Sequence, residues 1–164
     1  MNRFIDQYDI LILDVGQTFM FNVDRFSPND NLGLTYLELG GRTLEQELAA
    51  KLCIDVFREI SEASLLPENY ERLPSVKSCI DRHPAGLNLP ERERSILERT
   101  IALHEIGEIP EEYCTILRKL RKSHRLGIVS DIWSKSDLFY EKFRDLRILE
   151  LFEVIIFSSD IGLL

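Results

Sequence analysis

The sequence predicts an α/β protein built on a parallel sheet, with a long helical insertion. Three short apolar runs each end in small polar residues: Tyr8 to Leu13, Arg125 to Ser130 and Val154 to Phe157. Continuous apolar runs of this length are typical of parallel strands that are covered on both faces. Helical periodicity connects the later runs, and the order strand, helix, strand favours a doubly wound core.

The first element, Tyr8 to Leu13, is followed by a stretch of different character, from about Phe19 to Gly107, which contains helices and loops but no convincing parallel strand. The clearest helix should begin at Thr43, because Thr43 and Gln46 have the spacing of a capping box. Its apolar positions recur every four residues, at Leu44, Leu48, Leu52, Val56 and Ile60. Another helix is expected from Pro90. Roughly half of the chain is therefore a helical insertion.

Two further helices are expected on either side of the second apolar run. The first covers Glu111 to Lys122, with Pro110 before it, acids at its start and basic residues at its end, as the helix dipole favours. Its predicted buried stripe consists of Tyr113, Ile116, Leu117 and Leu120. The second lies before the third strand, and its stripe consists of Leu138, Phe139, Phe143 and Leu146.

Composition limits the class of protein. The chain has 164 residues and 45% hydrophobic content, which suits one globular domain or one domain with an insertion. A net charge of −8 argues against nucleic-acid binding, which requires a basic face. The three cysteines are scattered, so we expect free thiols and a reducing compartment. With no signal-like N-terminus and no apolar stretch near the ~20 residues of a membrane span, we expect a cytoplasmic protein without membrane contact.

Polar residues follow all three predicted strands. Asp14 ends the first, Ser130 and Asp131 end the second, and residues 158–160 (Ser-Ser-Asp) end the third. In open α/β sheets, ligands bind at the carboxyl ends of the strands. The most informative of these segments is Asp-Val-Gly-Gln-Thr, residues 14–18, because it combines an acid, a glycine that permits a turn and a threonine.

The segments ILILDVGQT and LGIVSD resemble the first two motifs of the haloacid dehalogenase-like (HAD-like) hydrolases, and FEVIIFSSDIGLL resembles the approach to their third. The resemblance covers about residues 8–18 and 111–164. It implies a Rossmann-like, three-layer core with a parallel sheet and a helical cap inserted after strand one. The implied division is residues 1–18 for the first strand and motif, 19–107 for the cap and 108–164 for the rest of the core.

The resemblance also implies roles for individual residues. Asp14 would be the nucleophile that forms an aspartyl-phosphate. Its carboxylate and the carbonyl of Gly16 would bind Mg²⁺, which prefers oxygen ligands. Ser130 would hydrogen-bond a phosphoryl oxygen as the second catalytic residue. Thr18 and Asp131 would lie at the substrate, Thr18 bracing the loop into the cap; a turn or capping role is the alternative for Asp131.

Two departures from the family pattern affect this interpretation. The second acid of the first motif, which protonates the leaving group, is Gly16 here, and Gln17 stands where a glycine is usual. The chain also ends at Leu164, before the family's lysine and later strands. The first strand would then be an open apolar edge. We therefore expect a fragment, a truncated product or part of an assembly, with a second copy or a missing C-terminal segment covering that edge.

The resulting functional hypothesis is a hydrolase that acts on a small molecule, most simply by phosphate-ester hydrolysis through Asp14. One alternative is a non-catalytic relative that serves as an interaction module, and another is a metal-independent dehalogenase. Outside the motifs, Arg25, Arg42 and Lys51 are expected to be solvated surface residues. Trp133 could line a pocket mouth, although packing is the commoner role of an aromatic residue beside a turn.

Overall fold

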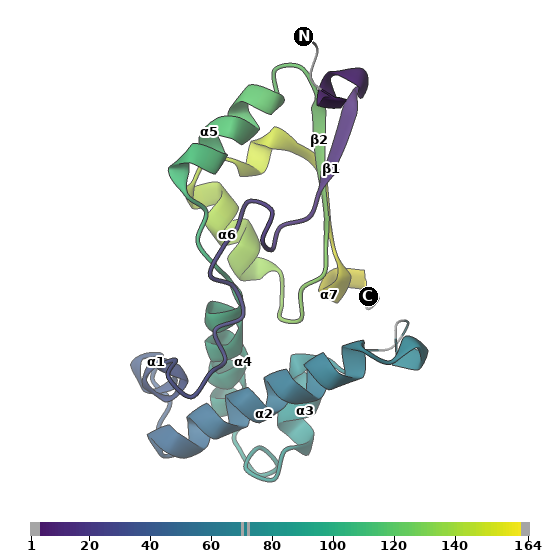
Figure 1. The fold of residues 1–164 in the computed structure, drawn as a ribbon. Coiled ribbons are helices and arrows are strands. Elements are labelled where there is room, and N and C mark those ends of the chain that lie inside the picture. Colours follow the sequence, from purple (N-terminus) through teal and green to yellow (C-terminus); the bar gives the residue numbers. More distant parts are fainter. Residues whose placement is uncertain (1–3, 70, 72, 162–164) are drawn as a thin grey trace.

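The computed structural model describes residues 4–69, 71 and 73–161. It is an α/β fold with a three-stranded parallel sheet, as predicted (Figure 1). The elements are η1 (Phe4–Gln7), β1 (Ile10–Leu13), α1 (Leu32–Glu38), α2 (Gln46–Ser64), η2 (Pro67–Asn69), α3 (Val76–Arg82), α4 (Glu91–Glu105), α5 (Glu111–Leu120), β2 (Arg125–Ser130), α6 (Asp137–Asp145), η3 (Leu149–Leu151), β3 (Phe152–Phe157) and α7 (Ser158–Ile161). No helix in these ranges is long and apolar enough to cross a membrane.

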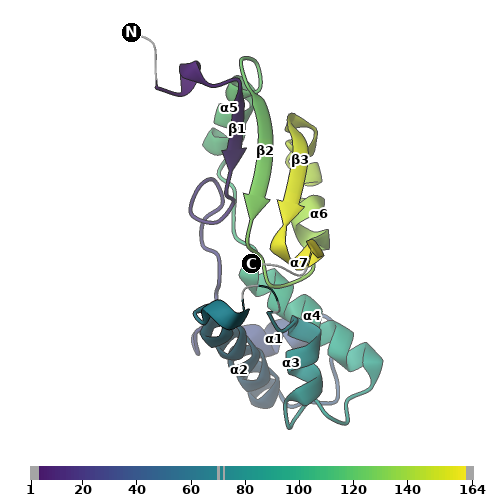
Figure 2. The same cartoon turned by 90° about the vertical axis from the view of Figure 1, so that its right-hand side faces the viewer.

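The sheet has the order β1-β2-β3, and the carboxyl ends of all three strands point toward the helices α1–α4 (Figure 2). Ile12 pairs with Gly127, and Gly127 pairs with Val154. A Cβ atom at Gly127 would lie 2.9 Å from both Ile12 Cδ1 and Val154 Cγ1. The glycine therefore lets the side chains of the two outer strands close over the central one.

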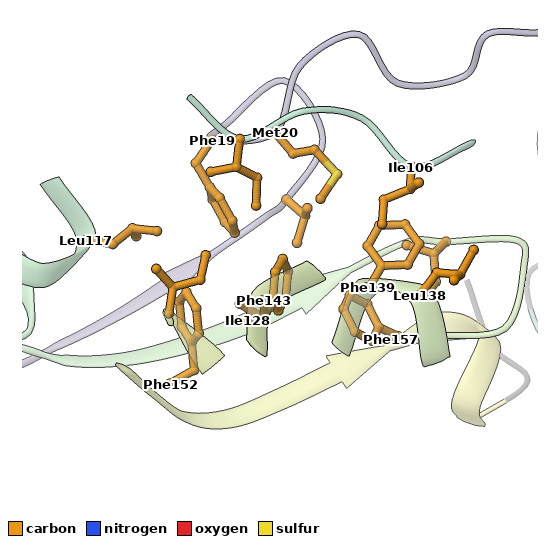
Figure 3. Packing of buried hydrophobic residues seen from close by; sticks show 14 of the residues in the cluster. Phe19, Met20, Ile106, Leu117, Ile128, Leu138, Phe139, Phe143, Phe152 and Phe157 are labelled. Atoms are coloured by element: carbon orange, nitrogen blue, oxygen red, sulfur yellow. The ribbon is translucent and has the colours of Figure 1, made fainter. Parts of the chain in front are cut away.

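One face of the sheet is covered by α5 and α6 (Figure 2). Aromatic side chains fill this interface, and Phe143 and Phe157 are fully buried there (Figure 3). Ile128 of β2 and Leu117 of α5 belong to the same cluster, as do Phe19 and Met20 from the loop after β1. The prediction of a buried stripe on α5 was wrong at Ile116, which is 47% exposed.

The opposite face of the sheet is open, so the prediction that the strands are covered on both faces was wrong for the described residues. The exposed fractions of Ile10, Ile12, Val129, Val154 and Ile156 range from 39% to 54%. An apolar run in a sequence does not reveal whether a second layer is present. We call these five side chains the open face below.

The helices α1–α4 form a separate layer with their own apolar cluster, which includes Tyr36, Leu52, Val56, Ile60 and Leu97. The predicted capping box at Thr43 was wrong. Helix α2 begins at Gln46 with Glu45 at its N-cap, and no side chain caps it. The backbone N–H groups of Thr43 and Leu44 instead donate to the Tyr36 hydroxyl, each at 3.1 Å. That hydroxyl in turn donates to Glu93.

The chain passes between the two layers along a pair of adjacent segments. Phe21 and Glu108 form an antiparallel bridge, with N–H···O distances of 2.8 and 2.7 Å. Asn22 and Asp24, just beyond the bridge, have positive φ angles of 54° and 57°. Gly107 is required beside the bridge, because a Cβ there would lie 2.1 Å from the Phe21 carbonyl oxygen. The domain boundaries predicted after residues 18 and 107 stay predictions.

Candidate functional site

Asp14 and Ser130 meet at the carboxyl ends of the neighbouring strands β1 and β2. The Ser130 hydroxyl donates to Asp14 Oδ1 at 2.6 Å and lies 3.4 Å from the Val15 nitrogen. The parallel register explains the contact, because Leu13 pairs with Ile128 and the following residues continue side by side. Ser130 is buried and Asp14 is exposed. Two residues that are 116 positions apart are thus brought together, and Ser130 bonds only one of the two Asp14 carboxylate oxygens.

The loop after Asp14 turns tightly around the Val15 carbonyl. This oxygen accepts N–H groups from Thr18, Phe19 and Met20 at 3.3, 3.2 and 3.1 Å. Gln17 adopts a φ of 55°, a conformation that a glycine tolerates more easily than a residue with a side chain. A Cβ atom at Gly16 would meet nothing within 4 Å. The turn therefore leaves open space at the position where the family pattern has its second acid.

A small hollow of about 50 Å³ lies against this turn and is lined by Gly16, Ser130 and Asp131, together with Asp24 and Glu105. Asp131 thus shares a cavity with two of the predicted site residues. Thr18 is exposed and is not among the residues that line the hollow. The roles assigned to these residues from the sequence stay predictions.

Glu105 is a site neighbour that the sequence did not reveal. It ends α4, is 6% exposed and reaches across to the loop that follows Ser130. Its Oε1 accepts the Trp133 N–H at 2.6 Å, and its Oε2 accepts the Ser134 N–H at 2.9 Å and also the Ser134 hydroxyl. Burial raises the pKa of the Glu105 carboxyl, against the effect of these donors.

Asp24 lines the same hollow, and although the residue as a whole is exposed, partial desolvation of its carboxyl group raises its pKa. No sequence signal marks either acid, because Glu105 is the last residue of an ordinary amphipathic helix and Asp24 lies in a loop. Only the folded chain brings them beside Ser130. The three basic residues considered above are bonded within their own neighbourhood: Lys51 with Asp55, Arg25 with the Leu103 carbonyl and Arg42 with the Leu37 carbonyl.

A larger cavity of about 490 Å³ adjoins the hollow, and Ile132 lines both. It lies between α3 and α4 on one side and the segments that follow β2 and β3 on the other. Trp133 is part of its wall, which is the first of the two roles considered for this residue from the sequence. The ring of Trp133 also packs 4.9 Å from the ring of Phe57 on α2.

The chemistry of the donors near Asp14 fits Mg²⁺. The Asp14 carboxylate and the Gly16 carbonyl are hard oxygen ligands, and the space beside Gly16 is free. The described residues contain no group of three or more His, Cys, Asp or Glu side chains that could enclose a metal. Mg²⁺ commonly binds through one or two carboxylates and fills its other positions with water and substrate phosphate. Mg²⁺ binding by Asp14 and Gly16 stays a prediction.

Comparison with known proteins gives a fold likeness. No family model matches the sequence, and no curated protein does. The solved structures include the HAD-hydrolase YfnB from Bacillus subtilis, described as bound to magnesium, with 15% identity and a TM-score of 0.49 over 95% of this chain. They also include the HAD family enzyme BT-2542 from Bacteroides thetaiotaomicron, with 13% identity and a TM-score of 0.48 over 95% of this chain.

The chain spans 66% of the length of YfnB and 70% of that of BT-2542. Identities and TM-scores this low leave the chemistry of the present chain to be argued from its own residues.

Proposed function

We propose that the chain is a HAD-like hydrolase in which Asp14 is the nucleophile and the substrate is a small phosphate ester. The observation that supports this most is the 2.6 Å contact between Asp14 and Ser130 at the carboxyl ends of two adjacent parallel strands. The position is the one at which ligands bind in open α/β sheets. A carboxylate with a free oxygen and a neighbouring hydroxyl supplies a nucleophile and a hydrogen-bond donor together.

In the proposed reaction, the Asp14 oxygen that Ser130 leaves free attacks phosphorus. The bond between phosphorus and the ester oxygen breaks, the leaving oxygen keeps the electron pair, and an aspartyl-phosphate forms. The Ser130 hydroxyl turns from Asp14 to a phosphoryl oxygen and stabilises its charge. The departed oxygen takes a proton from solvent. A water molecule then attacks the phosphorus of the intermediate, the bond between phosphorus and the Asp14 oxygen breaks, and phosphate leaves with the protons of that water, which restores the Asp14 carboxylate. Mg²⁺ held by Asp14 and Gly16 would neutralise charge on the phosphoryl group.

The glycine at position 16 carries a specific consequence for the leaving group. Position 16 offers no acid for protonation, and a positioned acid contributes about 10² to 10⁴-fold to such a step. Esters whose leaving group is already stable as an anion need this help least. We therefore expect aryl phosphates to react faster than alkyl phosphates, with a steep dependence of kcat on the pKa of the leaving alcohol.

The test compares phosphate release from a panel of aryl and alkyl monophosphates, with Mg²⁺, by the wild type and by Asp14→Asn. Removing a covalent nucleophile is expected to lower kcat by roughly 10³-fold or more. Asp9→Asn is the matched control, because Asp9 is exposed just before the other end of β1. Equal rates for wild type and Asp14→Asn would refute the nucleophile assignment.

A non-catalytic role is the second candidate, and the vacant acid position at Gly16 is the observation that favours it. Under that hypothesis no ester in the panel is turned over, although the chain is folded. Halide release in the presence of a chelator separates the remaining alternative, a dehalogenase that works without metal. Each outcome is distinct from Asp14-dependent, Mg²⁺-dependent phosphate release.

A further inference from the structure

The cavity of about 490 Å³ has the dimensions of a small-molecule site, since such sites occupy about 300–1,000 Å³. Its walls come from both layers of the fold. Helices α3 and α4 contribute one side, and the segments after β2 and β3 contribute the other. Because Ile132 is shared with the hollow at Ser130, the cavity begins two residues beyond the candidate catalytic serine.

Much of the cavity wall is apolar. Leu73 and Val76 line it from the helical layer, and Ile132, Trp133 and Leu138 line it from the segment after β2. The Trp133 ring is held by its packing against Phe57, and the Trp133 backbone is held by Glu105. A ligand in this cavity would therefore meet a preformed aromatic and aliphatic surface, which suits an apolar organic body.

The basic residues that line the cavity are already paired with acids. Lys135 lies 2.8 Å from Glu98, and Lys77 lies 2.9 Å from Glu91. Arg99, the third, lies 3.9 Å from Glu141, at the limit of an ion pair. A charged group on the ligand would have to compete with these acids or be buried without a partner, which is costly. The cavity walls thus disfavour an anionic group on the part of the ligand that lies inside the cavity.

We propose that this cavity binds the uncharged, largely apolar part of a small organic molecule. Together with the proposed function, on which this part of the inference rests, the cavity indicates that the substrate is a monophosphate ester of an aryl or arylalkyl alcohol. Sugar bisphosphates and nucleotides, which carry further charge, should bind less well, because Lys135 and Lys77 are already paired with acids.

The test uses Trp133, the single tryptophan of the chain, as a reporter in the cavity wall. The uncharged probe 4-nitrobenzyl alcohol is expected to quench its fluorescence saturably. The anion 4-nitrobenzoate has a similar size and should bind roughly tenfold more weakly or worse, because its charge finds no free partner. A quench that rises linearly without saturation would overturn the proposal, and tighter binding of 4-nitrobenzoate would overturn the inference about charge.

A variant pair locates the binding. Ser95 is an exposed residue of α4 that lines the cavity, so Ser95→Phe fills space there without disturbing the apolar clusters. Affinity for 4-nitrobenzyl alcohol should fall by roughly tenfold or more, as is usual when a site is overfilled. Ser123→Phe adds the same group at an exposed turn elsewhere and should bind like the wild type. Equal affinities for the two variants would place the probe outside this cavity and overturn the proposal.

Turnover of the aryl phosphates in the panel, measured beside binding of 4-nitrobenzyl alcohol, separates the two proposals. Saturable binding of the alcohol without Asp14-dependent hydrolysis would count against the nucleophile assignment and leave the cavity proposal standing. Asp14-dependent hydrolysis without binding of the alcohol would count against the cavity alone.

Discussion

Replacing Glu105 by glutamine removes one of the two buried acceptor oxygens of this side chain while keeping its shape. Glu105 accepts the backbone N–H groups of Trp133 and Ser134, one on each carboxylate oxygen. A glutamine side chain has a single acceptor oxygen, so its NH₂ group must face one of these two N–H groups. An unpaired buried donor costs about 1–3 kcal/mol. Glu105→Gln should therefore lower the free energy of unfolding by about that amount where Glu105 is protonated and uncharged.

The pH dependence has a defined sign. Burial raises the pKa of the folded-state Glu105 carboxyl above its unfolded value. Its stabilising contribution is complete below the unfolded pKa of about 4.3 and is lost as pH rises through the folded pKa. The difference between wild type and Glu105→Gln should accordingly be largest at acid pH and shrink toward neutral pH.

Urea unfolding followed by Trp133 fluorescence at several pH values measures this difference directly. Glu108→Gln is the control, because Glu108 is exposed and lies three residues further along the same segment. Its change should stay within about 0.5 kcal/mol. If Glu105→Gln and Glu108→Gln unfold alike at every pH, the Glu105 carboxyl group does not stabilise the loop after Ser130, and the prediction is refuted.

Three further outcomes follow from burial and exposure. Phe143→Ala should lower the free energy of unfolding by about 3–5 kcal/mol in urea titrations, because Phe143 is fully buried among aromatic rings; a loss below about 1 kcal/mol would contradict that packing. Burial raises the pKa of Cys53 to about 12 and that of Cys79 to about 11, so a thiol reagent should label them only in denaturant; rapid labelling of the native chain would argue against burial. Ile156→Lys should reduce light scattering at high concentration, because it interrupts the open face; unchanged scattering would show that this face does not drive association.

The sequence predicted the fold where local pattern decides structure. The run from Arg125 to Ser130 is β2 to the residue, and the helix expected from Pro90 begins at Glu91. The capping box failed because a distant residue, Tyr36, takes the N–H groups of Thr43 and Leu44. The open face was missed because strand patterns carry no information about which layers are present.

For the site, the sequence predicted that Asp14 and Ser130 belong to one site, because both stand at the carboxyl ends of strands in a parallel sheet. The register of β1 and β2 brings the two side chains within reach of each other. Glu105 could not be predicted, since its role depends on how the end of α4 meets the loop after β2. The paired state of Lys135 and Lys77, which determines the charge of the cavity, likewise depends on the packing of α4 against its neighbours.

The open face also affects the heat capacity of unfolding. The folded chain exposes 9756 Å², whereas a compact monomer of 19.1 kDa would expose about 8,400 Å². Side chains such as Ile12 and Val129 are already half in water before the chain unfolds. Because the heat-capacity increment arises mainly from newly exposed apolar area, it should fall below the usual 12–15 cal/mol/K per residue or so. The stability of this chain should therefore vary less with temperature than that of a closed domain of equal length.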